Sequence, residues 1–417
     1  MYKNLLSIIN YAYNNSTFYK KLYDNSGIKP EAIKSEEDIA KLPIVTKSMI
    51  QSDQENVISE EFMIYPKSSR LDVKRTSGST GKYLKIYWYD KDEVRSMVPL
   101  WLVRNRKYKV SPDMNFSSFY STIYKANNIV DMQEITKENN YLGFSKLDLT
   151  YEKMVEYYKM LIDFKPVWMM LQPSIAYMMA EIVKREKLPT LPSLKYLELS
   201  GEFLFDEYRK EIDEVFGIKS VNMYGCNETN CAAIELDDGK LHVLKENVYV
   251  EVIKNGKPVF DEEGDIYITS LNNHAMPFIR YETGDRGVLS DNNGDLILDV
   301  KTGRISEYIL LENGERLNSY TISGAMEYTN ENMQNVIKQY QAIQTGINEF
   351  KMTMVIDPKF SGWKEAVEEC FLENIKKNQL INTNWKFEWT DLICPEAETG
   401  KYRFFKNEIV TNNEKAD

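Results

Sequence analysis

A segment rich in glycine and hydroxyl side chains, Arg75–Lys82, is the first stretch whose residue types could do chemistry. Glycines let the backbone approach a ligand closely, and hydroxyl groups beside exposed amides can wrap a triphosphate. The loop is not a Walker A loop, because Gly78 and Gly81 are too close together and Tyr83 follows the lysine. Since a predicted strand follows at once, we favour a phosphate cradle over a linker. The cradle residues are Ser77, Gly78, Ser79, Thr80, Gly81 and Lys82.

Two later motifs each end in a carboxylate. In Tyr224–Glu228, after a predicted strand, Glu228 could hold magnesium beside phosphates, and Tyr224 could stack on a purine. In Tyr281–Asp285, the carboxylate of Asp285 could accept hydrogen bonds from two vicinal ribose hydroxyls. Taken singly, a surface turn explains Glu228 better than a metal site does, and it explains Asp285 equally well.

Two shorter motifs follow, Gly303-Arg304 and Thr399-Gly400-Lys401. A lysine placed like Lys401 could bridge a substrate carboxylate and an α-phosphate as charge redistributes. Read alone, it is more often a solvated lysine. The ordered set of five motifs is more informative than any member, because together they supply what ATP-driven activation of a carboxylate needs.

Bulk properties narrow the classes of protein that remain. With 417 residues the chain is too long for one ordinary core, so two or more domains are expected. A net charge of −11 argues against nonspecific binding of nucleic acid, and no apolar run is long enough to span a membrane. Leu5–Ile9 predicts an amphipathic helix and not a signal peptide, so we expect a cytoplasmic protein. The basic run Arg104–Lys109 is best explained as a solvated face, with a contact for a phosphorylated co-substrate as the alternative.

Histidine and cysteine usage limits the mechanism. The four cysteines form no C-x-x-C pair, so neither a disulfide framework nor a structural zinc site is indicated. Most hydrolytic triads depend on a histidine, and the chain has only two. We therefore expect chemistry that needs no histidine base.

The order of predicted elements indicates an α/β fold. The first 110 residues or so have a helical pattern, apart from a strand at Leu84–Tyr89. Leu194–Leu199 predicts a strand, Phe205–Phe216 a helix ending at Gly217, and Val221–Met223 another strand. Such an alternation predicts a parallel sheet with function at the carboxyl ends of its strands.

Two further regions have different patterns. Residues 247–300 are rich in predicted strands, with a hairpin of Val248–Ile253 and Asp265–Ile268 around the turn Asn255-Gly256, and a strand at Leu296–Leu298. Beyond Arg304 we predict a compact α+β unit. Its elements are a helix at 331–343, a strand at 350–356, a helix at 363–376 and a strand at 385–389. The predicted domains are therefore residues 1–304 and 305–417.

Taken together, the motifs resemble those of the adenylate-forming superfamily, and specifically the phenylacetate–CoA ligase family with its capsule-biosynthesis (CapK-like) relatives. The likeness covers nearly the whole chain and includes Leu42–Lys47, Ser200–Glu202 and Met276–Tyr281. It implies a large N-terminal α/β domain with a β-rich subdomain and a small C-terminal α+β lid. It also implies that ATP and a carboxylic acid give an acyl-adenylate and pyrophosphate, after which the lid rotates and a thiol attacks.

The resemblance also implies roles for individual residues. The loop hydroxyls and Lys82 would hold phosphates, Glu228 magnesium, and Asp285 with Arg304 the ribose. Lys401 would serve adenylation only. The adenine would be surrounded by Ser200, Gly201, Glu202, Tyr224 and Gly225. An acyl pocket would lie near Tyr120, Tyr124, Trp168, Met170 and Gln172, which suit an aryl or hydrophobic acid, although the same residues could be ordinary core.

Some positions depart from the family pattern, and some choices stay open. Ser306 occupies a hinge position that is often acidic or lysine, which puts the timing of lid rotation in doubt. The residues before Gly303 lack the cysteine pair that completes a zinc site in some relatives, so we expect no zinc. The acceptor would be coenzyme A or a carrier-protein phosphopantetheine. The alternatives are an amine acceptor, giving an amide, and a nucleotide-binding relative without turnover. A homodimer is implied by the resemblance alone.

Overall fold

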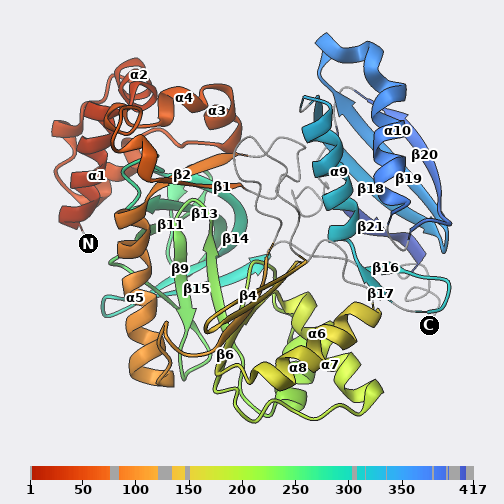
Figure 1. The fold of residues 1–417 in the computed structure, drawn as a ribbon. Coiled ribbons are helices and arrows are strands. Elements are labelled where there is room, and N and C mark those ends of the chain that lie inside the picture. The colour runs from red at the N-terminus through yellow and green to blue at the C-terminus, as the bar shows by residue number, and fades with distance from the viewer. Residues whose placement is uncertain are drawn as a thin grey trace. The chain divides into compact units, whose positions relative to one another are not determined.

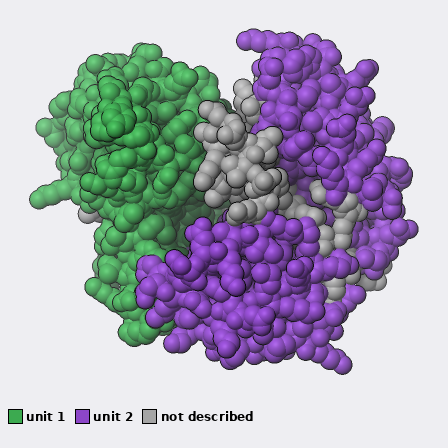
Figure 2. Space-filling view, in the orientation of Figure 1, with its two compact units in different colours: residues 1–77, 83–111, 221–303 green, residues 78–82, 112–220, 304–417 purple. Residues whose placement is uncertain are grey.

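The computed structural model describes residues 2–75, 84–120, 134–145, 151–302, 308–314, 316–334, 336–377, 380–390, 393 and 404–409. The chain divides into two compact units (Figure 2). Unit 1 comprises residues 1–77, 83–111 and 221–303, and unit 2 comprises residues 78–82, 112–220 and 304–417. The domain boundary predicted after Arg304 stays a prediction.

The N-terminal part of unit 1 is helical, as predicted. Its α-helices include α1 (Tyr2–Asn15), α2 (Thr17–Asn25), α3 (Lys47–Ser52), α4 (Gln54–Val57) and α5 (Asp90–Tyr108). Short 3-10 turns η1 to η4 lie at Pro30–Ala32, Glu36–Lys41, Glu60–Phe62 and Ser68–Arg70. Helix α1 buries Leu5, Ile8, Ile9 and Ala12, one face at helical spacing, so the amphipathic helix is confirmed. No helix in the described ranges combines the length and apolarity that crossing a bilayer requires.

Unit 1 also contains the β-rich region (Figure 1). Its antiparallel strands run in the order β12-β11-β13-β14-β15-β10-β9-β8. A separate hairpin joins β1 (Leu71–Arg75) to β2 (Lys85–Tyr89), which confirms the strand predicted after the glycine loop. The bounds of the sheet strands are β8 (Val221–Cys226), β9 (Asn230–Glu235), β10 (Leu241–Val243), β11 (Val248–Lys254), β12 (Lys257–Pro258), β13 (Glu263–Ser270), β14 (Tyr281–Asn292) and β15 (Asp295–Thr302).

The predicted pairing of residues 248–253 with 265–268 is confirmed, because β11 and β13 are antiparallel neighbours. The turn is used differently. Asn255 and Gly256 both have positive φ, 52° and 76°, as a tight hairpin turn requires. They join β11 to the short β12, and the chain continues into β13 on the other side of β11.

Unit 2 contains a parallel sheet in the order β7-β6-β3-β5-β4. Strands β7, β6, β3 and β5 are parallel, and β4 runs antiparallel at the edge. Helix α8 ends at Gly217 in the left-handed region, φ 68°, so the predicted helix and its cap are confirmed. The bounds are β3 (Phe116–Tyr120), β4 (Ile135–Glu138), β5 (Tyr141–Ser145), α6 (Tyr151–Phe164), β6 (Trp168–Leu171), α7 (Pro173–Glu186), β7 (Tyr196–Ser200) and α8 (Asp206–Phe216).

The C-terminal residues of unit 2 have their own hydrophobic core, centred on side chains such as Tyr340, Phe350 and Phe371. A four-stranded sheet, β20-β19-β18-β21, carries helices α9 and α10 (Figure 1). The strands at 350–356 and 385–389 and the helix at 363–376 are confirmed. The bounds are β16 (Tyr308–Leu310), β17 (Arg316–Asn318), α9 (Tyr320–Asn332), β18 (Ile337–Gly346), β19 (Glu349–Ile356), η5 (Pro358–Trp363), α10 (Lys364–Ile375), β20 (Asn384–Trp389) and β21 (Phe405–Asn407).

The helix predicted at 331–343 is wrong. Helix α9 ends at Asn332, and β18 occupies residues 337–346. Gln and Ala favour helices locally, but Tyr340, Ala342 and Gln344 are buried while the residues between them are not, a period of two. Because β18 pairs with both β19 and β21, packing in a central strand outweighs local propensity.

Candidate active site

Several predicted site residues lie outside the described ranges. They are Ser77, Gly78, Ser79, Thr80, Gly81, Lys82, Tyr124, Arg304, Ser306 and Lys401. The flanks of the glycine loop, both carboxylate motifs and the remaining predicted residues are described.

The hairpin that carries the two ends of the glycine loop is tied to the second motif within unit 1. The Lys74 ammonium on β1 donates to Asn230 Oδ1 at 2.8 Å. The Trp88 indole on β2 donates to the Asn227 carbonyl at 2.8 Å. Asn230 in turn donates to Ser96 Oγ on α5 at 2.6 Å. Both strands next to the loop are therefore anchored on the turn that holds Glu228.

The second motif needs its glycine. A Cβ on Gly225 would lie 2.2 Å from the Asn230 carbonyl oxygen, closer than any side chain can come. The β8–β9 ladder shifts register between Tyr224 and Gly225, and this shift brings the two backbones together. Glu228 follows in the tight turn between the strands.

The third motif forms a bulge in β14. Residues on either side pair regularly, Glu282 with Tyr267 and Arg286 with Asp265, so residues 283–285 stand opposite the single residue Ile266. Gly284 has φ 75°, and Thr283 Oγ1 donates to the Ile266 carbonyl at 2.8 Å. Asp285 is thereby released from the ladder, and its side chain contacts Tyr224 of β8.

Two tyrosine–carboxylate hydrogen bonds join the motifs. The Tyr224 hydroxyl donates to Asp285 Oδ2 at 2.9 Å, and the Tyr281 hydroxyl donates to Glu228 Oε1 at 2.9 Å. Each motif supplies the donor for the carboxylate of the other. We call these four residues the crossed pair. It brings together the two carboxylates that the sequence predicts for magnesium and ribose.

The surroundings keep one donor of the crossed pair, Tyr224, neutral. Burial and then the Asp285 carboxylate raise the pKa of Tyr224 well above its ordinary value. Burial and then Glu228 likewise raise the pKa of the Cys226 thiol. Glu228 is only 3% exposed. It contacts the Tyr281 hydroxyl and the Cys226 thiol, and no basic side chain among the described residues pairs with it. A buried carboxylate without a paired cation is costly, which favours a cation supplied by a ligand.

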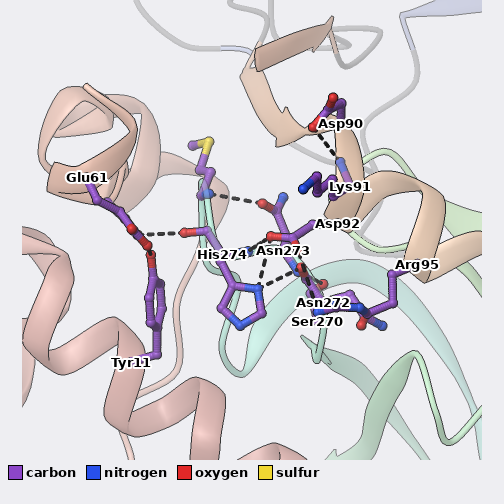
Figure 3. Close-up of polar contacts among 12 residues, drawn as sticks. Tyr11, Glu61, Asp90, Lys91, Asp92, Arg95, Ser270, Asn272, Asn273 and His274 are labelled. Atoms are coloured by element: carbon purple, nitrogen blue, oxygen red, sulfur yellow. Dashed lines mark hydrogen bonds and ion pairs between the residues drawn. The ribbon is translucent and has the colours of Figure 1, made fainter. Parts of the chain in front are cut away.

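The segment that leads into the third motif is held by polar contacts (Figure 3). His274 Nδ1 lies 3.0 Å from Asp92 Oδ2 of α5, and Ser59 Oγ donates to the His274 carbonyl at 2.7 Å. Asn273 Oδ1 accepts from the Met276 amide at 3.0 Å. The other histidine, His242, lies between two aspartates, at 3.0 Å from Asp238 and 2.9 Å from Asp295.

Three of the predicted adenine residues, Ser200, Gly201 and Glu202, lie in unit 2, where Glu202 contacts the start of α7, while Tyr224 and Gly225 lie in unit 1. Glu202 accepts hydrogen bonds from the amide and the hydroxyl of Ser174, both at 3.0 Å, and so caps this helix. Gly201 has φ 87°, and Ser200 ends β7. Gln172 precedes the first turn of α7. The carboxylate that the sequence assigns to adenine thus has a structural partner within its own unit.

The residues predicted for the acyl pocket differ in burial. Trp168 is 3% exposed and stacks on Phe116 with ring centroids 3.8 Å apart. Met170 and Tyr120 are half-buried, and the Tyr120 hydroxyl lies 2.9 Å from Thr136 Oγ1. Trp168 and Met170 alternate along β6 and so lie on one face of the sheet. Trp168 packs as a core residue does, whereas the other two keep exposed surface.

Sequence reasoning missed four residues of this arrangement: Tyr281 as a donor, and Lys74, Trp88 and Asn230 as anchors. One signal was available for the first. Both carboxylate motifs have a tyrosine four residues before the acid, Tyr224 before Glu228 and Tyr281 before Asp285. The anchors have no such signal, because they act through contacts between distant segments.

Comparison of the sequence with known proteins supports the resemblance that the motifs indicate. Residues 311–408 match the model of the CapK C-terminal domain. The phenylacetate-coenzyme A ligase of Thermus thermophilus is 27% identical over 293 residues, covering 68% of this chain and 63% of the relative. That of Escherichia coli is 23% identical over 287 residues, with 66% and 63% covered. The resemblance predicted from the motifs is confirmed. This chain spans 63% of the length of each of these relatives.

Solved structures agree on the fold. 2-Hydroxyisobutyryl-CoA ligase in complex with 2-HIB-AMP and CoA, in the thioesterification state, gives a TM-score of 0.64 at 17% identity, covering 99% of this chain and 90% of that one. The same ligase in the postadenylation state gives 0.59 with the same coverage. The predicted α/β fold of the adenylate-forming enzymes is confirmed.

Proposed function

We propose that this protein uses ATP to activate a carboxylic acid as an acyl-adenylate and then passes the acyl group to a thiol. The crossed pair carries this proposal, because it joins the two carboxylates that metal and ribose binding would need. Both lie in the unit whose β1–β2 hairpin flanks the glycine loop. The matched phenylacetate-coenzyme A ligases support a coenzyme A thioester as the product.

The reaction has two displacements. In the first, an oxygen of the substrate carboxylate attacks the α-phosphorus of ATP, and pyrophosphate leaves with the electron pair of the broken P–O bond. In the second, a thiolate attacks the acyl carbon, and AMP leaves. Neither step needs a histidine base, and both histidines already bond to aspartates in unit 1. Catalysis would therefore depend on positioning and on stabilising negative charge.

For ATP, we propose that the loop Ser77–Lys82 holds the phosphates and that Asp285 and Arg304 bind the ribose. Ser200–Glu202 and Tyr224 would contact the adenine. Lys401 would stabilise the transferring charge during adenylation. Tyr224 would also keep the Asp285 carboxylate oriented through its hydroxyl, at 2.9 Å.

Glu228 suits magnesium. Mg²⁺ usually takes one or two protein carboxylates and completes its shell with water and substrate phosphates. Glu228 is a buried carboxylate whose described partners are neutral, so a cation beside it would offset the cost of its burial. No group of three or more His, Cys, Asp or Glu in the described ranges could hold a metal ion. The ion would therefore arrive with ATP, and when bound it would neutralise phosphate charge.

The acid is proposed to be aryl or hydrophobic, and the thiol to be that of coenzyme A or of a carrier-protein phosphopantetheine. The half-buried Tyr120 and Met170 support an apolar acid. ATP–pyrophosphate exchange across a panel of aryl, alkyl and amino acids tests the first step. Thiols and amines added in turn, with AMP release measured, then identify the acceptor. ATP binding without exchange for any acid would overturn the proposal in favour of a nucleotide-binding protein without turnover.

Lys401→Ala tests the two-step scheme. We expect adenylation to fall by about 10²–10³-fold, the scale of losing one preorganised stabilising group. Thioester formation from preformed acyl-adenylate should remain close to wild type, because the lysine would act only in the first step. Single-turnover measurements of each half-reaction decide this. Equal losses in both would contradict a lysine that serves adenylation alone.

A further inference from the structure

The crossed pair links two motifs that are far apart in the sequence by one repeated chemical pattern. Each motif begins with a tyrosine and ends with a carboxylate, and each tyrosine donates to the carboxylate of the other motif. We propose that Tyr281 and Tyr224 are positioning residues, Tyr281 for the metal-binding carboxylate of Glu228 and Tyr224 for the ribose-binding carboxylate of Asp285. This inference rests on the proposed function and adds residues to it.

Tyr281 is a rigid donor. It is 4% exposed, and its ring packs edge-on against Phe278 with centroids 5.2 Å apart. Its backbone is held by a bridge to Val45, whose carbonyl accepts from the Glu282 amide at 2.9 Å. A hydroxyl on a fixed ring restricts the rotation of the carboxylate that accepts from it. Glu228 Oε1 is held in this way, while the carboxylate keeps lone pairs for a cation.

Tyr224 acts in the opposite direction, because it belongs to the second motif and donates to the third. Its hydroxyl meets Asp285 only because the bulge at 283–285 removes Asp285 from the strand ladder. The raised pKa of Tyr224 keeps this hydroxyl protonated, so it remains a donor at neutral pH. The donor thus fixes one oxygen of a carboxylate, a group that can accept several hydrogen bonds, and so sets the direction in which Asp285 faces vicinal hydroxyls.

The proposal predicts two separable defects. In Tyr281→Phe, Glu228 loses its orienting bond, and we expect the affinity for Mn²⁺ in the presence of ATP to fall by about 10-fold or more, as for other groups that orient a metal ligand. In Tyr224→Phe, we expect the preference for ATP over 2′-deoxy-ATP to shrink while the Mn²⁺ affinity stays near wild type. A purely structural role would lower both together with stability.

Tyr11→Phe is the matched control. The Tyr11 hydroxyl donates to Glu61 Oε1 at 2.5 Å, the same chemistry in the same unit but apart from both motifs (Figure 3). It should change neither Mn²⁺ affinity nor nucleotide preference. Thermal unfolding of every variant shows whether the fold is kept. If Tyr281→Phe does not fold, Tyr224→Phe still tests the positioning role of a tyrosine, through the preference for ATP over 2′-deoxy-ATP.

Mn²⁺ binding is measured by electron paramagnetic resonance with ATP present, and nucleotide preference by competition binding of ATP and 2′-deoxy-ATP. Neither readout needs turnover. If the wild type binds both ligands yet exchanges pyrophosphate with no acid, the proposed function fails while the positioning roles can still hold. If the wild type exchanges pyrophosphate but both phenylalanine variants bind like it, the positioning roles are overturned.

Discussion

Two consecutive residues, Arg280 and Tyr281, belong to contacts of different kinds. The Arg280 guanidinium donates to both oxygens of Glu251 on β11, each at 3.0 Å, and also to the carbonyls of Ala40 and Leu42. Both charged side chains are nearly inaccessible, at 3% and 4% exposed. The Tyr281 hydroxyl donates to Glu228, a carboxylate that is just as buried, at 3% exposed.

The difference between these two contacts distinguishes a carboxylate that stabilises the fold from one that can still bind a ligand. A buried charge with an opposite charge and further hydrogen bonds has no capacity left for a ligand, so it specifies the fold. Within the part of the chain that the structure describes, the carboxylate of Glu228 has neutral partners and keeps lone pairs, which is the state in which a cation can use it. Arg280 has a positive φ, 48°, immediately before β14 begins at Tyr281, so the two consecutive side chains reach different partners.

Breaking the ion pair between Arg280 and Glu251 should have the largest effect on stability. Arg280→Ala leaves Glu251 buried and unpaired, and we expect a loss of about 3–5 kcal/mol in the free energy of unfolding. Urea denaturation measures it. The control replaces both partners, Arg280→Met with Glu251→Leu, and should recover most of the loss because no charge stays buried. A single variant as stable as the wild type would show that the contact does not hold the fold.

The same variant should respond to pH. Burial raises the pKa of Glu251, and Arg280 opposes this shift in the wild type. A carboxyl whose folded pKa lies above its unfolded value favours the protonated folded form, so stability falls as pH rises through that range. Without Arg280 the opposing effect is gone. As the pH is lowered from about 8 to about 5, Arg280→Ala should therefore regain part of its lost stability. Denaturation at both pH values measures this. A loss independent of pH would argue against a buried charge as its cause.

Removing the charge of Glu228 should have the opposite effect: activity should fall while stability is kept. Glu228→Gln keeps an acceptor for Tyr281 but removes the charge that a cation needs. We expect adenylation to drop by about 10²-fold or more, since metal-ion stabilisation supplies several kcal/mol. The unfolding free energy should stay the same or rise, because a buried charge is lost. Pyrophosphate exchange and urea denaturation on one preparation test this. Full activity in Glu228→Gln would remove this residue from the site.

An exposed ion pair gives the smallest effect and completes the series. Arg70 on η4 pairs with Asp90 at the start of α5, and both side chains are about two-fifths exposed, at 43% and 39%. Water and salt screen such a pair. Arg70→Gln should leave the melting temperature and pyrophosphate exchange unchanged within error. A marked loss of either would mean that the pair does more than its exposure suggests.

The fold and much of the site could be predicted from the sequence because both are encoded by local patterns. The ordered glycine and carboxylate motifs predicted the resemblance to phenylacetate-coenzyme A ligases, and the strand-forming residues Val248–Ile253 before the turn Asn255-Gly256 predicted a strand. Where the local pattern misled, at 331–343, the deciding contribution was pairing with strands on both sides. No local pattern carries that information.

The crossed pair itself lay beyond the sequence for a geometric reason. Tyr224 reaches Asp285 only through the register shift at Gly225 and the bulge at 283–285. Motif spacing fixes which residues are present, but a one-residue change of register would turn each side chain to the other face. The presence of the carboxylates could therefore be predicted, but the pairing of each carboxylate with the tyrosine of the other motif could not.

The bulge in β14 also limits how this strand can be exchanged. Thr283 Oγ1 replaces the missing ladder bond to the Ile266 carbonyl, so the hydroxyl and the facing backbone position work as one module. Deleting Thr283 and Gly284 would leave Asp285 alone opposite Ile266, restore a regular ladder and bring the aspartate back into line. A chimera built with a relative must therefore transplant both edges of the irregularity together, or it will inherit a well-folded strand without the proposed ribose carboxylate in place.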